Sequence, residues 1–440
     1  MQLTNGKPMN ASIDPPVAAH LKNHAHPAGA SGASCKFCGA GLRFAMADLG
    51  MSPIANDYRK PDQLYKMEPF YPLRALVCES CLLVQAQEFE SAEHLFAPDY
   101  AYFSSFSDTM LAHASKYVDD MTERFGLGSN SLVVEIACND GYLLRWFLPK
   151  GIKVLGIEPT TGTAKAAQKL GIPVETLFFG RKTAQELRDK GHAADLMPAN
   201  NVVAHVPDIN DFIGGFKILL KPQGVATFEF HHIMNLIGRN QFDAIYHEHY
   251  YYHSLSTFSR ILAHHGLQVF DVEEISMHGG SLRVYAQPAG TGAHPVAARV
   301  TDLLAREKAF GLTTIDRYLE VNESIKKMKR RFLSFLIEAK AAGKTIAGYG
   351  APAKATTLLN FAGARSDFID YIVDRSPHKQ GTYLPGAQIP IHGPERIFET
   401  KPDYLLILAW NLRDEVSQQM ADIRKWGGKF MVLIPDVAVF

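Results

Sequence analysis

The stretch SLVVEIACNDGYLLRWFLPKGIKVLGIEPTT, residues 131–161, predicts a strand, a tight turn, a helix and a second strand. Residues 132–136 form a short apolar run rich in β-branched side chains. A helical pattern covers 142–147 and ends at Gly151, and the second strand covers 153–157. This order of elements is typical of a nucleoside-binding half of an α/β fold.

The residues around the turn favour one kind of nucleoside. Glu158 closes the second strand, where a carboxylate accepts hydrogen bonds from both ribose hydroxyls. A dinucleotide-binding turn needs several glycines to approach pyrophosphate, but Ala137 and Asn139 leave only Gly141. S-adenosylmethionine has no pyrophosphate, and Glu135 ahead of the turn suits its ammonium group. The alternative is a generic α/β turn with an ordinary surface Glu158, and an NAD-dependent dehydrogenase is less favoured.

Length and composition limit the classes of function. A chain of 440 residues predicts about three domains. Lys plus Arg and Asp plus Glu number 45 each, which favours neither nucleic acid nor an anionic membrane as a partner. No stretch has the apolar length of a membrane span and no secretory signal is visible, so we expect a cytoplasmic protein. Residues 1–33 lack periodicity and are predicted to be a disordered tail.

Four of the five cysteines form two C-x-x-C pairs. Such pairs supply four thiolates to one tetrahedral zinc ion and leave no open position for catalysis. The pairs are separated by 39 residues, which predicts a small domain closed by the metal. Two disulfides or a redox C-x-x-C are the alternatives. The predicted zinc ligands are Cys35, Cys38, Cys78 and Cys81.

The α/β alternation continues after Glu158. Helices are predicted at 163–170 and 208–220, and strands at 194–199 and 225–230, with a Pro-x-Gly turn before the last strand. This pattern is typical of the second half of a doubly wound sheet.

The segment 229–253 is unusually rich in titratable side chains, with five histidines, two glutamates and four tyrosines. Histidine exchanges protons near neutral pH, and Glu248 can orient or tune a neighbouring imidazole. We expect one acid–base pair here, with the remaining side chains as walls. A second metal site at His247 and His249 is one alternative, and hydrogen-bonded fillers at a domain junction are the other.

A charged helical stretch at 296–341 leads to a final α/β part. A strand at 345–349 precedes a glycine-containing turn with Lys354, and a strand at 368–373 ends at Asp374. This arrangement suits a diphosphate group. The alternative is a packing domain that binds no ligand.

Several unrelated motifs occur in one order over residues 34–440. The chain resembles the S-adenosylmethionine-dependent sugar C-methyltransferases, three-domain enzymes that methylate C3 of nucleotide-linked 4-keto-deoxysugars. The motifs that carry the resemblance are the two cysteine pairs with DLG (48–50) and YPL (71–73) between them, EIACNDGYLL (135–144), GIEP (156–159), NVVAH (201–205), YHEH (246–249), GYGAPAK (348–354) and VDRSP (373–377).

The resemblance implies the roles of individual residues. A base removes a proton beside the ketone, and the resulting enolate takes the methyl group. His249 is the implied base, with Glu248 beside the sugar, Tyr246 at the reacting centre and Tyr102 on the opposite wall. Contacts to S-adenosylmethionine are expected from Glu135, Ala137, Asn139, Asp140, Gly141, Glu158, Pro159, Asn201 and His205. Contacts to the nucleotide sugar are expected from Gly350, Ala351, Lys354, Asp374 and Asn411.

The expected architecture is an α/β protein with a small zinc-binding domain, a class I methyltransferase domain and a C-terminal Rossmann-like domain. The expected bounds are 34–92 for the zinc-binding domain, 93–295 for the methyltransferase domain, 296–341 for a helical connector and 342–440 for the C-terminal domain. We expect a monomer or a small homo-oligomer. A non-catalytic or metal-dependent nucleotide-sugar-binding protein on the same domains is the competing hypothesis.

Overall fold

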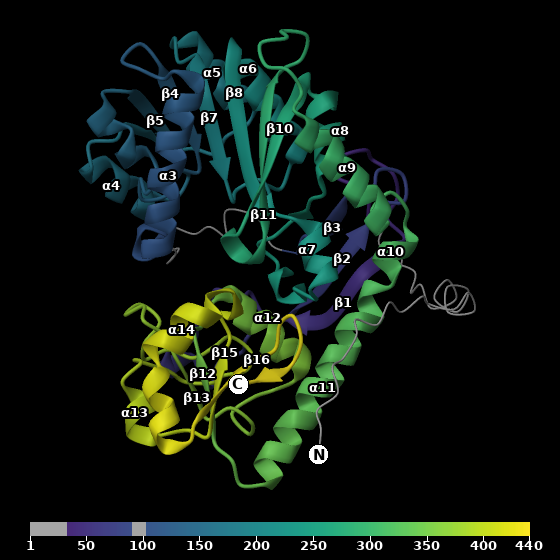
Figure 1. The fold of residues 1–440 in the computed structure, drawn as a ribbon, viewed down its shortest axis with the longest axis vertical. Coiled ribbons are helices and arrows are strands. Elements are labelled where there is room, and N and C mark those ends of the chain that lie inside the picture. The colour runs from purple at the N-terminus through teal and green to yellow at the C-terminus, as the bar shows by residue number, and fades with distance from the viewer. Residues whose placement is uncertain (1–32, 90–102) are drawn as a thin grey trace, which may run out of the picture.

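The computed structural model describes residues 33–89 and 103–440. The predicted tail and Tyr102 therefore lie outside the described residues, apart from Ala33. Three β-sheets organise the described chain, one near each end and one in the middle of the sequence (Figure 1). The predicted α/β class with two Rossmann-like sheets is confirmed.

The first sheet has four antiparallel strands in the order β1-β2-β3-β9. Its strands are β1 (Phe44–Ser52), β2 (Tyr71–Val77), β3 (Val84–Ala86) and β9 (Tyr251–Tyr252). Strand β9 belongs to the histidine-rich segment, and its residue Tyr252 pairs with Val84 of β3. The end of the histidine-rich segment is therefore paired with β3 as a strand of the first sheet.

The second sheet has seven strands in the order β10-β11-β8-β7-β4-β5-β6. The five strands from β8 to β6 are parallel, and β11 runs antiparallel to both of its neighbours. The bounds are β4 (Leu132–Ile136), β5 (Lys153–Ile157), β6 (Val174–Glu175), β7 (Ala194–Asn200), β8 (Leu220–His231), β10 (Leu267–Ile275) and β11 (Ser281–Pro288). Strand order reverses between β4 and β7, and ligands of open α/β sheets bind beyond the carboxyl ends of strands at such a point.

Seven α-helices occur in the same part of the described chain as the strands of this sheet. They are α3 (Asp108–Phe125), α4 (Thr161–Lys169), α5 (Arg181–Asp189), α6 (Ile209–Leu219), α7 (Ile233–Gly238), α8 (Leu255–His264) and α9 (Ala298–Phe310). Asp208 caps α6 by accepting hydrogen bonds from the backbone N–H groups of Asn210 and Asp211, which explains why the predicted helix begins there.

Two local predictions in this region are wrong. The expected helix at 142–147 is instead a pair of short 3-10 helices, η3 (Leu144–Trp146) and η4 (Leu148–Lys150). Pro149 lacks a backbone N–H and lies in η4, so a continuous α-helix does not extend to Gly151. The Pro-x-Gly sequence at 222–224 is not a turn that precedes a strand, because β8 already begins at Leu220.

The third sheet has six strands in the order β14-β13-β12-β15-β16-β17, all parallel except β17. Its strands are β12 (Ile346–Tyr349), β13 (Tyr371–Val373), β14 (Ile391–His392), β15 (Tyr404–Ile407), β16 (Lys429–Val432) and β17 (Ala438–Val439). The helices are α10 (Asp316–Leu319), α11 (Val321–Ala341), α12 (Ala353–Ala362), α13 (Arg396–Thr400) and α14 (Arg413–Gln419). The remaining 3-10 helices are η1 (Pro61–Gln63), η2 (Ser104–Phe106), η5 (Phe242–Ala244), η6 (Met277–Gly279), η7 (Trp410–Leu412) and η8 (Ala421–Trp426).

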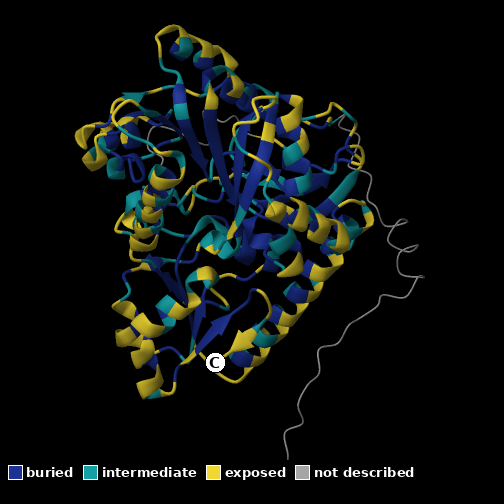
Figure 2. Ribbon diagram, turned by 45° about the horizontal axis from the view of Figure 1, so that its top comes forward, coloured by how far each residue is buried: buried dark blue, intermediate teal, exposed yellow. Residues whose placement is uncertain are grey.

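One apolar core joins the first sheet to the C-terminal part. Met46 of β1, Phe332 of α11 and Leu359 of α12 are fully buried members of the same cluster. The long helix α11 runs along one side of the molecule beside the C-terminal sheet, and the strands of the sheets are dark, buried layers in Figure 2. Burial of this shared apolar surface stabilises one arrangement of the first and third sheets.

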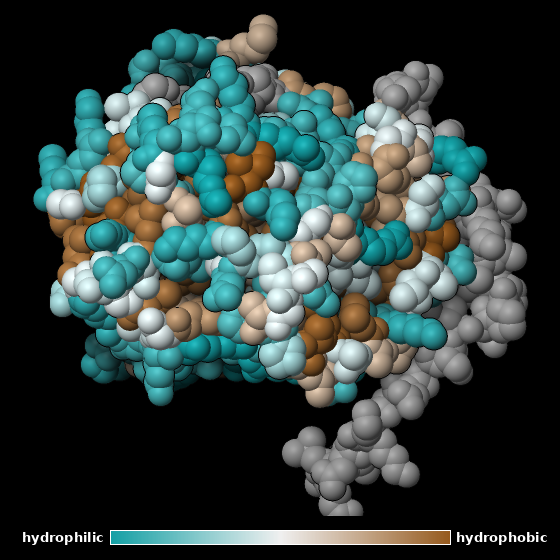
Figure 3. Space-filling view, turned by 90° about the horizontal axis from the view of Figure 1, so that it is seen from above, coloured by the Kyte–Doolittle hydropathy of each residue, from teal (hydrophilic) through white to brown (hydrophobic). Residues whose placement is uncertain are grey.

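The surface seen from above is mostly hydrophilic, with separate hydrophobic patches between the hydrophilic residues (Figure 3). Within the described residues, no helix combines the length and the apolar character that crossing a membrane requires.

Candidate active site and zinc centre

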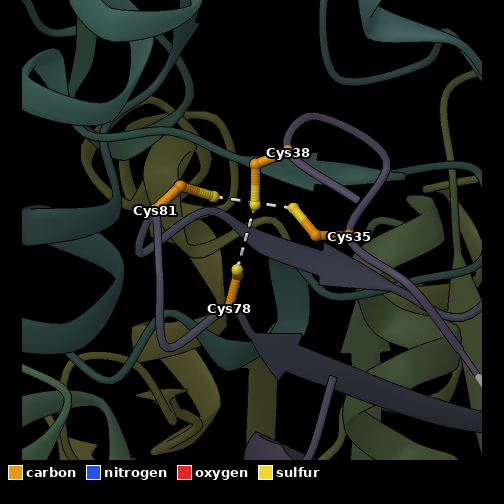
Figure 4. A group of neighbouring side chains, drawn as sticks. All are labelled: Cys35, Cys38, Cys78 and Cys81. Atoms are coloured by element: carbon orange, nitrogen blue, oxygen red, sulfur yellow. Dashed lines mark hydrogen bonds between the residues drawn. The ribbon is translucent and has the colours of Figure 1, made fainter. Parts of the chain in front are cut away.

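The two cysteine pairs meet in one cluster. The four Sγ atoms lie within 4.8 Å of one another, with Cys35 and Cys81 separated by 3.5 Å and Cys38 and Cys78 by 3.6 Å (Figure 4). Tetrahedral zinc with bonds of about 2.3 Å requires sulfur atoms about 3.8 Å apart, so the cluster fits zinc. None of the four forms a disulfide. The amide of Gln85 donates to Cys35 Sγ at 3.2 Å and orients this ligand, a contact that the sequence did not reveal.

A cavity of about 620 Å³ lies where the strand order of the seven-stranded sheet reverses. Its walls come from the first part of the chain, the methyltransferase-like sheet, the histidine-rich segment and the C-terminal part. Asn56, Glu158, His249 and Lys354 represent these four contributions. The cavity therefore joins segments that are distant in sequence.

Glu158 lies on the wall of this cavity and is buried. Its two carboxylate oxygens accept hydrogen bonds from the backbone N–H groups of Asn139 and Thr160, both at 2.9 Å. Burial raises the pKa of Glu158, whereas these N–H groups favour its charged form. The hydroxyl groups of Thr160 and Thr163 also favour the charged form of Glu158.

The turn after β4 has a left-handed backbone conformation at three residues, and one of the three is a glycine. The φ angles are 58° at Ala137, 51° at Asn139 and 79° at Gly141. Asn139 is stabilised there because its side-chain oxygen accepts a hydrogen bond from the Ser104 backbone at 3.0 Å. A Cβ atom on Gly141 would lie 2.5 Å from the side chain of Ile172, so that position requires glycine.

The structure brings most, but not all, of the predicted cofactor residues to the cavity. Ala137, Asn139, Glu158, Pro159, Asn201 and His205 line it. Glu135, Asp140 and Gly141 do not belong to its wall. Burial, together with the nearby carboxylates of Glu158 and Asp140, raises the pKa of Glu135 well above its usual value.

Tyr246 and His249 form a pair at the cavity wall. The Tyr246 hydroxyl lies 2.6 Å from His249 Nε2, and His249 Nδ1 lies 2.8 Å from the carbonyl oxygen of Ala244. The carbonyl accepts only, so Nδ1 carries the proton and Nε2 carries the lone pair. Burial, and then the neighbouring His205, lower the pKa of His249 well below its usual range. The Nε2 atom of His249 is therefore unprotonated.

Glu248 faces the same cavity and is 1% exposed. Its oxygens accept hydrogen bonds from Asn56 Nδ2 at 2.9 and 2.8 Å. Burial raises the pKa of Glu248 to about 7, and the hydrogen bonds from Asn56 oppose that rise. His205 donates from Nδ1 to the backbone oxygen of Glu248 at 2.8 Å, which fixes the segment from the other side.

Other members of the histidine-rich segment have structural contacts, as the filler alternative predicted for most of them. His232 contacts Glu307 at 2.7 Å in the fully buried interior, and His247 donates to the carbonyl of Pro72 at 3.2 Å. His253 packs against Phe230. In the described part of the chain, the cysteine cluster is the one group of three or more potential metal ligands in close proximity. The side chains of His247 and His249 have separate partners and do not form a metal site.

Lys354 reaches the cavity from the start of α12. Its Nζ lies 4.8 Å from the centre of the Trp410 ring and 3.4 Å from the carbonyl oxygen of His278. Trp410 in turn donates from Nε1 to Asp243 at 2.6 Å. Burial lowers the pKa of Lys354, and the charge of Asp243 opposes this effect. Lys379 also lines the cavity and donates to the carbonyl oxygen of Ala351 at 2.9 Å.

Only some of the residues predicted to bind the nucleotide sugar line the cavity. Asp374 accepts hydrogen bonds from the backbone of Ala351 at 2.7 Å and of Ser376 at 2.8 Å. These bonds hold the turn, in which Gly350 has a φ of 85°. Gly350, Ala351 and Asp374 do not belong to the cavity wall, whereas Asn411 does.

Sequence reasoning missed several wall residues. Asn56, His278, Lys379 and the segment 177–179 line the cavity. Lys379 follows the VDRSP motif closely, so a basic residue after a strand end was an available signal. Asn56 lies inside the long gap between the cysteine pairs, and nothing in its local sequence distinguishes it.

A mostly parallel sheet with a cavity at its reversal point, a carboxylate after the second strand and no dinucleotide fingerprint is typical of a Rossmann-like nucleoside-binding protein. Comparison with known families identifies three matching domain models. Residues 110–272 match a methyltransferase domain, 276–435 match a C-methyltransferase C-terminal domain, and 35–96 match a domain that its model names for zinc binding.

Full-length similarity extends beyond these domains. The C-methyltransferase NovU of Streptomyces niveus is 33% identical over 405 residues, which span 92% of this chain and 96% of NovU. A ubiquinone biosynthesis O-methyltransferase of Rhodopseudomonas palustris is 30% identical over 95 residues, 22% of this chain and 38% of that protein. The chain belongs to the C-methyltransferase family, as the motifs predicted, and it is an S-adenosylmethionine-dependent enzyme with a zinc-binding cysteine cluster.

Solved structures resemble part of the chain. Magnesium protoporphyrin IX methyltransferase from Synechocystis has a TM-score of 0.31 and 17% identity, with 41% of this chain and 81% of that chain covered. A didemethyltoxoflavin N1-methyltransferase from Burkholderia thailandensis has a TM-score of 0.35 and 15% identity, with 47% and 95% covered.

Proposed function

We propose that this enzyme transfers a methyl group to C3 of a nucleotide-linked 4-keto-deoxysugar. The observation that supports this substrate is the composition of one cavity. Glu158, the Tyr246–His249 pair and two lysines of the C-terminal part all line it. These groups match a nucleoside, a carbon acid and a diphosphate, respectively.

The proposed chemistry starts at the C–H bond beside the ketone. A base takes the C3 proton, and the electron pair of that bond forms an enolate across C3, C4 and the ketone oxygen. S-adenosylmethionine supplies a methyl group on a sulfonium centre, which departs as a neutral thioether. The new bond forms at C3, the ketone is restored, and the proton remains on the base.

His249 is the proposed base. Its neutral state and its Nδ1–H bond to the Ala244 carbonyl leave Nε2 as the proton acceptor. Tyr246 marks the direction of that lone pair, because its hydroxyl lies 2.6 Å away. In the proposed complex the Tyr246 hydroxyl donates to the developing enolate oxygen, and a donor of this kind stabilises charge where it appears. Glu248 contacts the sugar beside the reacting centre.

The cofactor residues form one side of the proposed complex. The Glu158 carboxylate is the proposed acceptor for the ribose hydroxyls, and the left-handed turn at 137–141 lets the backbone approach the ligand closely. Leu177 and Phe178 offer apolar surface on the same wall for a base ring. Asn201 and His205 are proposed to contact the methionine end.

The nucleotide of the sugar is proposed to bind against the C-terminal part. Lys354, Lys379 and Asn411 line that side of the cavity. Two ammonium groups balance the charge of a diphosphate. We also propose the domain bounds 34–92, 93–295 and 342–440, with 296–341 as the connector, and a cytoplasmic location, where the cysteines stay reduced for zinc.

The test uses the zinc-loaded protein, methyl-labelled S-adenosylmethionine and a panel of dTDP-, GDP- and CDP-linked 4-keto-deoxysugars. The expected result is one labelled product with the added methyl at C3, identified by mass spectrometry and NMR. The matching 4-hydroxy sugars are the controls, because they have no acidic C3 proton. Transfer to a 4-hydroxy sugar, or transfer to oxygen, would reject the proposed reaction. Tight binding of a 4-keto sugar without transfer would favour the non-catalytic binder.

A further inference from the structure

The long gap between the two cysteine pairs has a place in the active site. It carries β1, β2 and the connecting segment 53–70, and Asn56 of that segment lies on the cavity wall. Asn56 Nδ2 lies 2.9 and 2.8 Å from the two carboxylate oxygens of Glu248. We propose that Asn56 is a positioning residue that the zinc-binding part contributes to the reaction, acting through Glu248. This inference rests on the proposed function for its catalytic consequence.

Helix α12 holds both partners of this contact. The Thr356 hydroxyl donates to the carbonyl oxygen of Ala55 at 3.0 Å, and the Thr357 hydroxyl donates to the carbonyl oxygen of Ile245 at 2.9 Å. Both threonines are buried. Adjacent residues of one helix therefore fix the segment before Asn56 and the segment before Glu248.

Further hydrogen bonds join the segment 53–70 to the C-terminal part. The Tyr58 hydroxyl donates to the carbonyl oxygen of Ala351, and Arg59 pairs with Tyr383 through two backbone hydrogen bonds of 3.0 and 2.8 Å. Gly386 donates from its backbone to Glu68 at 2.7 Å. The position of Asn56 is thus determined by tertiary contacts on both sides, and not by a flexible surface loop.

The hydrogen bond from the Asn56 side chain lowers the pKa of Glu248. An amide NH₂ donates only, and it favours the carboxylate over the neutral acid. Other groups that face this part of the site are Tyr58, Lys379, His205 and His249. His205 contacts the backbone of Glu248, so among these contacts Asn56 is the donor to its carboxylate. Loss of that side-chain donor leaves the buried carboxylate with the backbone N–H of Asn56 as its remaining compensating contact.

The expected change in rate on loss of the Asn56 side chain follows from the change in the pKa of Glu248. Burial already raises the pKa of Glu248 to about 7, and Asn56 lowers it from a still higher value. Hydrogen bonds to charged groups are strong enough that their loss raises the pKa by about one to two pH units. At pH 7 the ionised fraction then falls from about one half to between about a tenth and a hundredth. The rate at pH 7 falls about 5- to 50-fold and returns at higher pH.

The experiment compares three substitutions with increasing loss of donor character, Asn56→Ser, Asn56→Ala and the isosteric Asn56→Asp. The acid limb of the kcat profile should move to higher pH in that order, with S-adenosylmethionine affinity and zinc content unchanged. Asp57→Asn is the matched control, because Asp57 is the exposed neighbour and pairs with Arg59 at 3.8 Å. Thr356→Val is a second variant, which should shift the same limb by loosening the anchor of the segment.

A substrate-free measurement separates the two proposals. Carbon-13 NMR of protein labelled at glutamate carboxyl carbons follows the titration of Glu248, with Glu248→Gln to assign its signal. Asn56→Ala should raise this pKa even if no nucleotide sugar is methylated. The titration therefore tests the role of Asn56 independently of the proposed methyl transfer. An unchanged Glu248 titration, or equal loss of kcat at every pH, overturns the positioning role.

Discussion

The Tyr246 hydroxyl lies 2.6 Å from Nε2 of His249, while Nδ1 of the same ring donates to the Ala244 carbonyl. The two contacts fix the tautomer and the direction of the basic lone pair. They also occupy both ring nitrogens with protein groups, so His249 is not a metal ligand in this arrangement. The proposed proton transfer requires the Tyr246 hydroxyl to turn from Nε2 to the substrate oxygen, which frees the lone pair.

Replacement of the proposed base should slow chemistry without loss of binding. We expect His249→Asn to bind both ligands and to transfer methyl groups about 10²- to 10⁴-fold more slowly, because a general base contributes about that factor. Exchange of the C3 proton with deuterated water, which needs the base but no methyl donor, should fall in proportion. NMR of the sugar measures this exchange.

His247→Gln is the control for this prediction. The His247 side chain contacts the Pro72 carbonyl and does not line the cavity, so exchange should continue near the wild-type rate. If His249→Asn exchanges the C3 proton at the wild-type rate, another residue is the base. If His247→Gln is as damaging as His249→Asn, the second metal site is favoured again.

The pH dependence should report Glu248 and not His249. The pKa of His249 is well below its usual range, whereas the pKa of Glu248 is about 7. Activity that requires the Glu248 carboxylate is present above pH 7 and decreases as the pH falls through that value. In Glu248→Gln the rate should be lower at high pH, and the acid limb near pH 7 should disappear. Persistence of this limb would assign it to another group.

Removal of the Glu158 carboxylate should weaken cofactor binding. Glu158→Ala removes a charge-assisted acceptor of the ribose hydroxyls, which corresponds to about 1.5–3 kcal/mol of binding free energy. Calorimetry with S-adenosylmethionine measures the change. Glu175→Ala is the matched control, because Glu175 closes the neighbouring strand β6 and does not line the cavity. Unchanged affinity in Glu158→Ala would reject its role at the ribose.

Loss of the Lys354 charge should affect the nucleotide sugar more than the cofactor. We expect Lys354→Ala to raise the KM for the sugar nucleotide about 10- to 150-fold, the factor for a lost hydrogen bond to a charged group. Steady-state kinetics measures this KM, and calorimetry measures cofactor affinity. Lys344→Ala should change neither, because Lys344 pairs with Asp403 on the exposed surface. If Lys354→Ala also changes neither, the C-terminal part is a packing domain without a ligand.

The cysteine cluster should hold one zinc ion per chain. Cys78→Ser replaces one of four thiolates, and we expect zinc content to fall and thermal stability to decrease while S-adenosylmethionine still binds. Elemental analysis and thermal unfolding measure both effects. Ser80→Ala in the same turn is the control and should retain the metal. Disulfides in the wild-type protein, with no zinc, would contradict the assignment.

The sequence alone determined the order of the domains, the cysteine cluster, the family and the two strands that precede Glu158. These features depend on local spacing: two C-x-x-C pairs chelate one ion, and an acid after the second strand of a βαβ unit lies beside a nucleoside. The motif order also pointed to Tyr246, Glu248 and His249 as neighbours.

The tertiary structure alone decided which side chains reach the cavity. Asp374 and Glu135 looked suitable in sequence, but Asp374 holds its own turn and Glu135 is buried away from the wall. Asn56 carried no local signal, yet Thr356 and Thr357 contact the segment before Asn56 and the segment before Glu248 and place them side by side. Contacts between residues so far apart in sequence depend on packing across three sheets, which local periodicity does not encode.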